Sequence, residues 1–203
     1  MKESLFGFSF SLICFAVFVF IGCNQPVDSG NVNNDIYNLN IGDTGPAGGI
    51  VFYIDIENDF DWTYLEVAPK STEMTAAWDP ARTAVGGAAM SKAIGGGYAA
   101  TQAIIAVIPT DGIAARLCAE LEHEHDGTTF KDWFLPSRGE LSILRTNLID
   151  ITAPGEFQAN WYWSSSDETV PSTNFANAVN FATGAMGPEN KANSRPVRAI
   201  RSF

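Results

Sequence analysis

The chain has 203 residues, of which 46% are hydrophobic and 12% aromatic. This length suits one domain with an appendage, and the aromatic content is too high for a disordered chain. The chain has 23 acidic and 12 basic residues, which gives a formal net charge of −11. Because nucleic-acid affinity depends largely on cations that contact phosphates, this charge argues against a nucleic-acid-binding protein.

The N-terminus has the pattern of an export signal. Residues 5–22 carry no charge and follow Met-Lys-Glu-Ser, which is typical of a secretory leader. The Phe-Ile-Gly-Cys sequence that ends at Cys23 resembles a bacterial lipobox, in which the cysteine becomes lipidated. We therefore predict a lipoprotein signal peptide over residues 1–22, a lipid on Cys23 that contacts the membrane, and a place in the cell envelope, at the outer membrane or the cell surface. An uncleaved transmembrane anchor is the alternative, but the next basic residue is Lys70, so a stop-transfer flank is missing.

Residues 23–40 are rich in asparagine and show no hydrophobic period, so we predict a flexible tether. The domain is then expected over residues 41–203. Its single cysteine, Cys118, cannot form an internal disulfide. Cys118 lies in a helical pattern, so we expect a small core residue rather than a nucleophile.

The predicted elements of the domain begin with strands. Residues 50–54 are a continuous run of β-branched and aromatic residues, and residues 63–67 alternate in polarity, which predicts a strand and its hairpin partner. Apolar residues then recur with helical spacing at Ile104, Ile105 and Ile108, and again at Ile113, Leu117 and Leu121.

A capping box and a set of short strands follow. Ser137 and Glu140 have the spacing of a capping box, which opens a helix whose inward face carries Leu141, Leu144 and Leu148. Short strands are predicted over residues 161–165, 174–181 and 197–200. Strands at both ends with helices between them predict an α+β fold rather than alternating βαβ units.

Several segments carry a family resemblance. The most specific are Trp133-Phe134-Leu135-Pro136-Ser137 and Tyr162-Trp163-Ser164-Ser165-Ser166, joined by residues 41–53, 62–69, 114–118 and 197–201. Together they resemble the Lcl C-terminal domain family over residues 41–203. This resemblance implies a C-type-lectin-like fold with an N-terminal hairpin, two to three central helices and a C-terminal antiparallel sheet. It also implies adhesion or ligand binding, and sulfated polysaccharide binding is suggested for the family's namesake.

The resemblance also places the contact surface. Residues 174–194 look like the ligand-facing segment that some lectin-like surface proteins diversify. Short polar side chains in turn-rich stretches are common at binding surfaces, so the predicted ligand contacts are Asn174, Asn177, Asn180, Thr183, Asn190 and Asn193. Trp161 and Trp163 share a strand face and could stack on sugar, but we favour core positions for them.

Two patterns suggest a metal site, and neither is strong. Acidic residues from Asp55 to Glu66 have the spacing of an EF-hand loop, but Phe60 occupies the position where that loop needs glycine. We favour an acidic, solvated hairpin tip. His123 and His125 lack a third ligand, so a solvated helix end is favoured over a metal site. We therefore predict no metal and no cofactor.

No motif in the chain indicates catalysis. The formylglycine-generating enzymes resemble the same C-type-lectin-like fold. Their activity would need catalytic cysteines near the C-terminus, and the last cysteine here is Cys118. Arg195, Arg198 and Arg201 could clamp an anion, but pairing with internal carboxylates is favoured. The sequence predicts a non-enzymatic protein that binds a glycan or a protein. The alternatives are a structural or assembly lipoprotein of the envelope without a sugar site and, with no supporting motif, an enzyme that acts on envelope polymer.

Overall fold

The computed structural model describes residues 37–153, 156–169 and 172–203, which lie within one compact unit spanning Asn33–Phe203. The predicted signal peptide and Cys23 lie outside the described residues. In the described part, the fold is α+β as predicted, with three α-helices and four antiparallel sheets. No helix in these ranges has both the length and the apolar character needed to cross a membrane.

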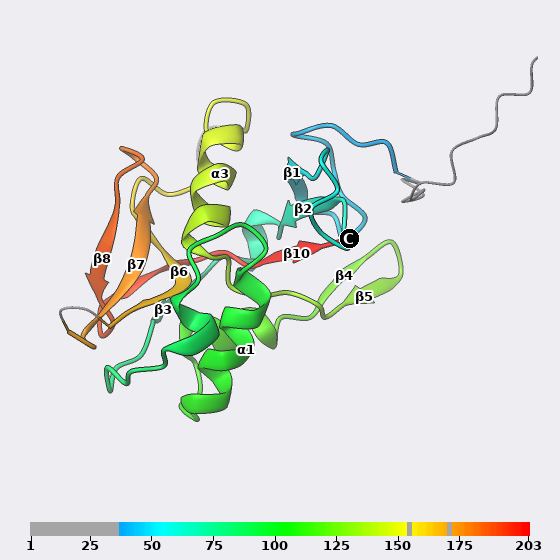
Figure 1. Cartoon of the computed structure of the whole chain (residues 1–203). Coiled ribbons are helices and arrows are strands. Elements are labelled where there is room, and N and C mark those ends of the chain that lie inside the picture. Colours follow the sequence, from blue (N-terminus) through cyan, green and yellow to red (C-terminus); the bar gives the residue numbers. More distant parts are fainter. Residues whose placement is uncertain (1–36, 154–155, 170–171) are drawn as a thin grey trace, which may run out of the picture. The chain divides into compact units, whose positions relative to one another are not determined.

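The predicted N-terminal hairpin is present. Strand β1 (Ile50–Ile54) pairs antiparallel with β2 (Tyr64–Val67), with an irregularity in the register between Val51 and Tyr53. The other edge of β2 pairs with the last strand, β10 (Ile200–Ser202), so β2 is the central strand of this sheet. Figure 1 shows β10 beside β2, although the two strands come from opposite ends of the domain.

The region between the first hairpin and the helices contains elements that were not predicted. The 3₁₀ helix η1 (Lys70–Thr72) precedes strand β3 (Met74–Ala77), and a second 3₁₀ helix, η2 (Gly87–Met90), follows. Strand β3 pairs with β9 (Ser194–Val197) in a sheet of two strands. These segments connect the predicted strands to the central helices.

The central helices are α1 (Gly97–Val107), α2 (Ala114–Ala119) and α3 (Arg138–Leu148). The capping box of α3 is confirmed, since Glu140 N donates to Ser137 Oγ at 3.2 Å and Ser137 N donates to Glu140 Oε2 at 2.6 Å. The leucines predicted for its inward face, Leu141, Leu144 and Leu148, are fully buried.

The prediction of a helix end at His123–His125 is wrong, because the segment is a hairpin. Strand β4 (His123–His125) pairs with β5 (Thr128–Phe130). The two residues between them, Asp126 and Gly127, have φ values of 48° and 77°. Positive φ at both central positions is the requirement of a type I′ hairpin turn, and Asp-Gly is a favoured sequence for it.

The C-terminal antiparallel sheet is confirmed as a meander of β6 (Trp161–Glu168), β7 (Phe175–Asn180) and β8 (Met186–Asn190). The single strand predicted over residues 197–200 is wrong. The chain leaves β9 at Arg198 and enters β10 at Ile200, and so passes from one sheet to another. Arg198 is buried at this crossing, where its Nε donates to Ala68 O at 2.8 Å.

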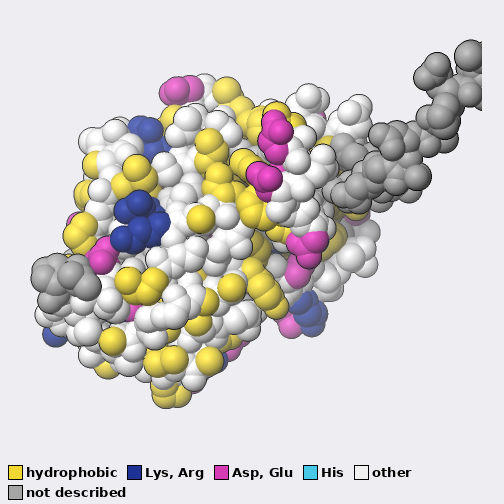
Figure 2. All heavy atoms as spheres, viewed as in Figure 1, with side chains coloured by type: hydrophobic (Ala, Val, Ile, Leu, Met, Phe, Trp, Pro, Cys, Tyr) yellow, Lys and Arg dark blue, Asp and Glu magenta, His cyan; other side chains and the backbone are white. Residues whose placement is uncertain are grey.

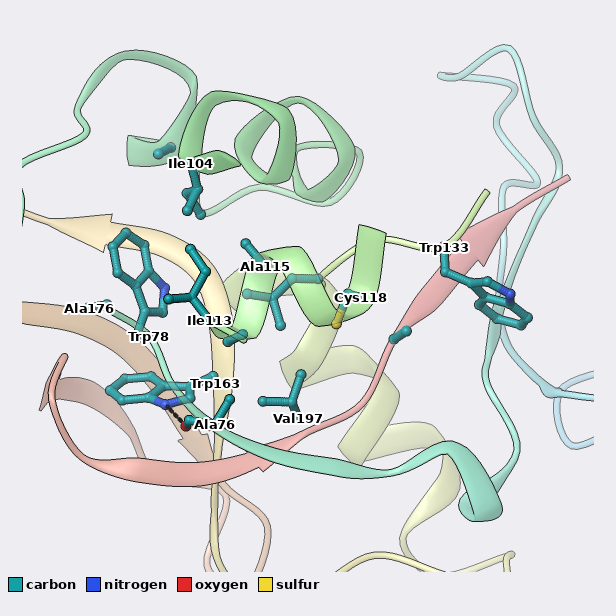
Figure 3. Close-up of a cluster of buried hydrophobic side chains, with 14 of the residues drawn as sticks. Ala76, Trp78, Ile104, Ile113, Ala115, Cys118, Trp133, Trp163, Ala176 and Val197 are labelled. Carbon is teal, nitrogen blue, oxygen red and sulfur yellow. Dashed lines mark hydrogen bonds between the residues drawn. The ribbon is translucent and has the colours of Figure 1, made fainter. Parts of the chain in front are cut away.

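The core consists of two clusters of buried side chains. The first surrounds Trp78, Trp133 and Trp163, and the second packs α3 against β1, β2 and β7. Figure 3 shows the first cluster, in which Trp163 Nε1 donates to Ala76 O at 3.1 Å. Trp163 is therefore a core residue, and Trp161 is half-buried against the same cluster. Cys118 lies in this cluster as predicted, and burial raises the pKa of its thiol, which keeps it protonated and unreactive.

A buried ion pair fastens the segment after β3 to the C-terminal sheet. Lys191 Nζ lies 2.6 Å from Asp167 Oδ1, and both side chains are fully buried. Lys191 Nζ also donates to Thr83 O at 2.6 Å and lies 4.3 Å from the centre of the Trp78 ring. The other oxygen of Asp167 accepts the N–H of Val85 at 2.9 Å. Both charges are thus satisfied inside the protein, as buried charges need to be.

Candidate functional site

The predicted contact residues of the Asn-rich segment do not form one surface. Asn180 and Thr183 lie at the turn that joins β7 to β8. Asn174, Asn190 and Asn193 lie at the opposite end of this hairpin, where Phe175 pairs with Asn190. Strand β8 has five residues, which corresponds to roughly 16 Å. A single small ligand therefore cannot contact both groups.

Several of these side chains stabilise turns. Asn180 Oδ1 accepts the N–H groups of Ala182 at 2.9 Å and Thr183 at 3.2 Å. Asn190 Oδ1 accepts the N–H of Ala192 at 3.0 Å. Such bonds from a side chain to the backbone two or three residues later are the reason that asparagine is common in turns. Asn180 and Asn190 therefore shape the two turns in which they lie.

Asn177 is a correction to the predicted contact set. Its side chain is only 1% exposed, so it cannot reach a ligand. Its Nδ2 donates to Ser166 O at 3.3 Å and to Asp167 O at 3.4 Å. Its Oδ1 accepts from Arg138 Nη1 at 3.3 Å. Asn177 fastens β7 to the irregular part of β6 and is a structural residue.

The structure places a hollow of about 430 Å³ elsewhere in the domain. Four segments build it: the loop before β2, the start of α1, the segment before α3, and β10. Its lining residues are Asp61, Trp62, Gly95, Tyr98, Ala99, Asp132, Phe134 and Ser202. The lining thus combines aromatic rings with carboxylates, a composition that suits a site with an apolar wall and a few polar contacts.

Trp62 forms one aromatic wall of the hollow. Its ring stacks on Phe60 with a centroid distance of 4.3 Å and an interplanar angle of 3°, and it meets Tyr53 edge-on at 6.0 Å. Gly95 supports this arrangement, because a Cβ at that position would lie 2.4 Å from Phe60 Cε1, and its φ is +81°. The Phe60 ring therefore packs closely against the backbone at Gly95, where a larger residue would not fit.

Tyr98 forms a second aromatic wall, on the first turn of α1. It is 56% exposed, which is unusual for a large aromatic residue in this domain. Its ring meets Phe134 edge-on, with centroids 5.8 Å apart and an interplanar angle of 84°. Tyr98 therefore presents an exposed aromatic surface at the hollow while Phe134 remains buried behind it.

Arg201 binds Asp132, one of the two carboxylates that line the hollow. Its Nε and Nη2 donate to the two oxygens of Asp132 at 2.9 and 2.8 Å, and its Nη1 donates to Glu66 Oε1 at 2.8 Å. Burial lowers the pKa of the Arg201 guanidinium, but the hydrogen bonds to Asp132 and Glu66 outweigh burial and raise it overall. Asp132 is thereby held in one orientation, and both Asp132 and Asp61 are exposed to solvent.

Glu140 anchors the backbone behind the hollow. Its Oε1 accepts the N–H groups of Gly95 at 2.8 Å and Gly97 at 3.3 Å, and its Oε2 accepts that of Ser137. The carboxyl is 1% exposed. Burial raises the pKa of Glu140, although these backbone hydrogen bonds oppose the shift. The capping residue of α3 thus also fixes the start of α1.

The acidic segment that has the spacing of a calcium loop begins at Asp55 and ends at Glu66, and both carboxylates accept hydrogen bonds within the protein. Asp55 is buried and its Oδ2 accepts the N–H of Phe60 at 2.9 Å. Glu66 is fully buried and accepts from Ala47 N at 3.2 Å as well as from Arg201. In the ranges that the structure describes, no group of three or more His, Cys, Asp or Glu side chains could hold a metal ion.

The arginines near the end of the chain pair with internal carboxylates, as favoured from the sequence. Arg198 lies 3.0 Å from Glu73 Oε2 and also contacts Glu156. Arg201 holds Glu66 and Asp132, and Arg195 contacts Glu189. These three residues therefore do not form an anion clamp.

The sequence offered only weak signals for the hollow. Trp62 follows a run of acidic residues, and Tyr98 follows the three consecutive glycines 95–97. An aromatic residue beside glycines suggests a close approach of the backbone, but it does not say which other segment approaches. No protein-family model matches the chain, and no curated protein sequence matches it.

Proposed function

We propose that this chain is a lipid-anchored envelope protein whose single domain binds a glycan in the hollow, without catalysing a reaction. The observation that carries this proposal is the pair of aromatic walls, Trp62 and the exposed Tyr98, beside the carboxylates of Asp61 and Asp132. The lipid anchor rests on the sequence up to Cys23, which lies outside the described residues.

Aromatic side chains and carboxylates are suited to complementary parts of a sugar. The apolar face of a pyranose ring packs on an aromatic ring, which buries apolar area at low conformational cost. Sugar hydroxyl groups donate to carboxylate oxygens, and hydrogen bonds to charged acceptors are stronger than neutral ones. Asp132 is held by Arg201 before any ligand arrives, so little ordering is needed on binding.

A C-type-lectin-like fold is part of the same proposal. Two features support it: the sequence segments that resemble the Lcl C-terminal domain family, and the sheet in which β10 lies beside β2 near the start of the domain. The hollow adjoins this sheet through Ser202 of β10. The fold by itself does not specify a ligand, so the assignment of a glycan depends on the residues that line the hollow.

The proposal is tested by probing a glycan array with the full chain in non-ionic detergent, once with calcium and once with a chelator. We expect binding that survives the chelator. Tyr98→Ala is expected to weaken binding by about tenfold, since an aromatic contact contributes up to roughly 1.5 kcal/mol beyond its buried area. The matched control is Val107→Ala, because Val107 is 47% exposed on the same helix and does not line the hollow.

Two results would count against this function. Equal losses in Tyr98→Ala and Val107→Ala would show that the hollow is not the site. Binding to no glycan would favour the alternative of a structural or assembly lipoprotein, for which the partner is then sought by cross-linking in envelope membranes.

A further inference from the structure

We infer that the hollow selects a glycan that carries a protonated amino group and rejects sulfated or carboxylated glycans. This inference rests on the proposed function, because it specifies the charge of the glycan bound there.

The charged lining residues are both acidic. Asp61 and Asp132 line the hollow, and among the described residues that line it none is Lys or Arg. Asp61 belongs to the exposed tip of the first hairpin, which also carries Glu57 and Asp59. Figure 2 shows acidic side chains spread over the viewed face, with basic groups at its left and one basic group at its lower right beside acidic ones. An anionic glycan would therefore meet like charges on entering the hollow.

Arg201, the cation behind the lining, does not reverse this field. Its guanidinium is shared between Glu66 and Asp132, and its side chain is only 9% exposed. One positive charge against these two carboxylates leaves a net negative charge, to which Asp61 adds a second. Every donor nitrogen of Arg201 has a carboxylate partner, so a sulfate would have to displace one of them.

The aromatic walls favour a cation for a separate reason. An ammonium group near the ring of Trp62 or Tyr98 is attracted by the negative electrostatic potential of the ring face. A de-N-acetylated amino sugar brings both parts of this recognition, an apolar ring face and an ammonium group. Its N-acetylated counterpart keeps the ring and loses the charge, so the two ligands isolate the contribution of charge.

The experiment is isothermal titration of the full chain in non-ionic detergent, at about pH 6, where an amine with a pKa of roughly 8 is protonated. The probes are a glucosamine tetramer, an N-acetylglucosamine tetramer, a sulfated heparin-type tetrasaccharide and tetralysine. We expect the glucosamine tetramer to bind roughly three- to tenfold more tightly than the N-acetylated form. No binding is expected for the sulfated probe.

Variants separate the hollow from the general charge of the protein. Asp61→Asn is expected to reduce the preference for the amine to within about twofold, because it removes the charge and keeps a side-chain oxygen that can accept from a sugar hydroxyl. Asp150→Asn is the control, because Asp150 is exposed, does not line the hollow, and gives the same change in net charge. Its preference for the amine is expected to equal that of the unaltered chain.

The outcomes distinguish this inference from the proposed function. Equal affinity for the glucosamine tetramer and the N-acetylglucosamine tetramer overturns the inference and leaves glycan binding in place. Tightest binding of the sulfated probe has the same consequence. Tetralysine bound as tightly as the glucosamine tetramer overturns it too, because the attraction would then be unspecific. Binding of no saccharide overturns both the inference and the proposed function.

Discussion

Replacing Lys191 with methionine tests whether the buried ion pair organises the segment after β3. Methionine fills a similar volume but removes the ammonium group that lies 2.6 Å from Asp167 Oδ1. Asp167 keeps its hydrogen bond from Val85 N but loses its only described ion-pair partner. Removing one partner of a buried pair costs about 3–5 kcal/mol. With a urea dependence of about 2 kcal/mol per molar, the unfolding midpoint is expected to fall by roughly 1.5–2.5 M.

The assay is urea unfolding monitored by tryptophan fluorescence. Trp78 reports directly on the substituted position, because its ring lies next to Lys191. Lys131→Met is the control, since the Lys131–Glu122 pair is equally short at 2.7 Å but more than half exposed, and it is expected to cost under about 1 kcal/mol. The double variant Lys191→Met, Asp167→Asn removes both charges and is expected to recover part of the loss. A midpoint shift for Lys191→Met no larger than that of the control would refute this reasoning.

Two further predictions concern the supports of the hollow. Burial raises the folded-state pKa of Glu140, so its contribution to stability is present in acid and is lost as the pH rises through that pKa. The stability of the unaltered chain relative to Glu140→Gln should therefore increase as the pH is lowered from about 7 to about 4. The measurement is the difference between the urea midpoints of the two proteins. Gly95→Ala should lower stability by more than the roughly 1–2 kcal/mol typical of a left-handed non-glycine residue, because its Cβ would also lie 2.4 Å from Phe60. Gly87→Ala, with a φ of +54° and no atom within 4 Å of its Cβ, should show the backbone cost alone, and equal midpoints for the two alanine variants would contradict the steric argument.

The sequence was informative where local interactions determine the structure. The capping box of Ser137 and Glu140 depends on four consecutive residues, and its prediction is confirmed. The first hairpin follows from the β-branched run of β1 and the alternation of β2, and it is confirmed too. In both cases the residues that decide the structure are close in the sequence, so their pattern is visible without knowledge of the rest.

Other elements owe their conformation to distant partners. Strand β3 has the sequence Met-Thr-Ala-Ala, which has little intrinsic strand preference, and it is extended because it pairs with β9. Strand β8 contains Gly187 and Pro188, which normally mark turns, but it lies at the edge of its sheet, where proline is tolerated. The β4–β5 hairpin was missed although Asp126-Gly127 is a recognisable turn signal.

The candidate site was not predictable for a related reason. Trp62, Tyr98 and Asp132 come from three separate segments that meet only in the folded domain. The Asn-rich segment attracted the prediction because its composition is typical of binding loops, yet Asn177 is buried and Asn180 stabilises a turn. Composition identifies polar, turn-rich stretches, but it does not distinguish residues that shape a turn from residues that contact a ligand.

The position of β2 between β1 and β10 also constrains the order of events during folding. Arg201 lies opposite Glu66 across this sheet, although the two residues are 135 positions apart. The loop-closure entropy of such a distant contact makes it slow to form. Until β10 arrives, the β1–β2 hairpin has an unpaired edge, and Glu66 has no cation opposite it. The hollow therefore cannot be complete before β10 pairs with β2, and until then the free edge of β2 can pair with another chain.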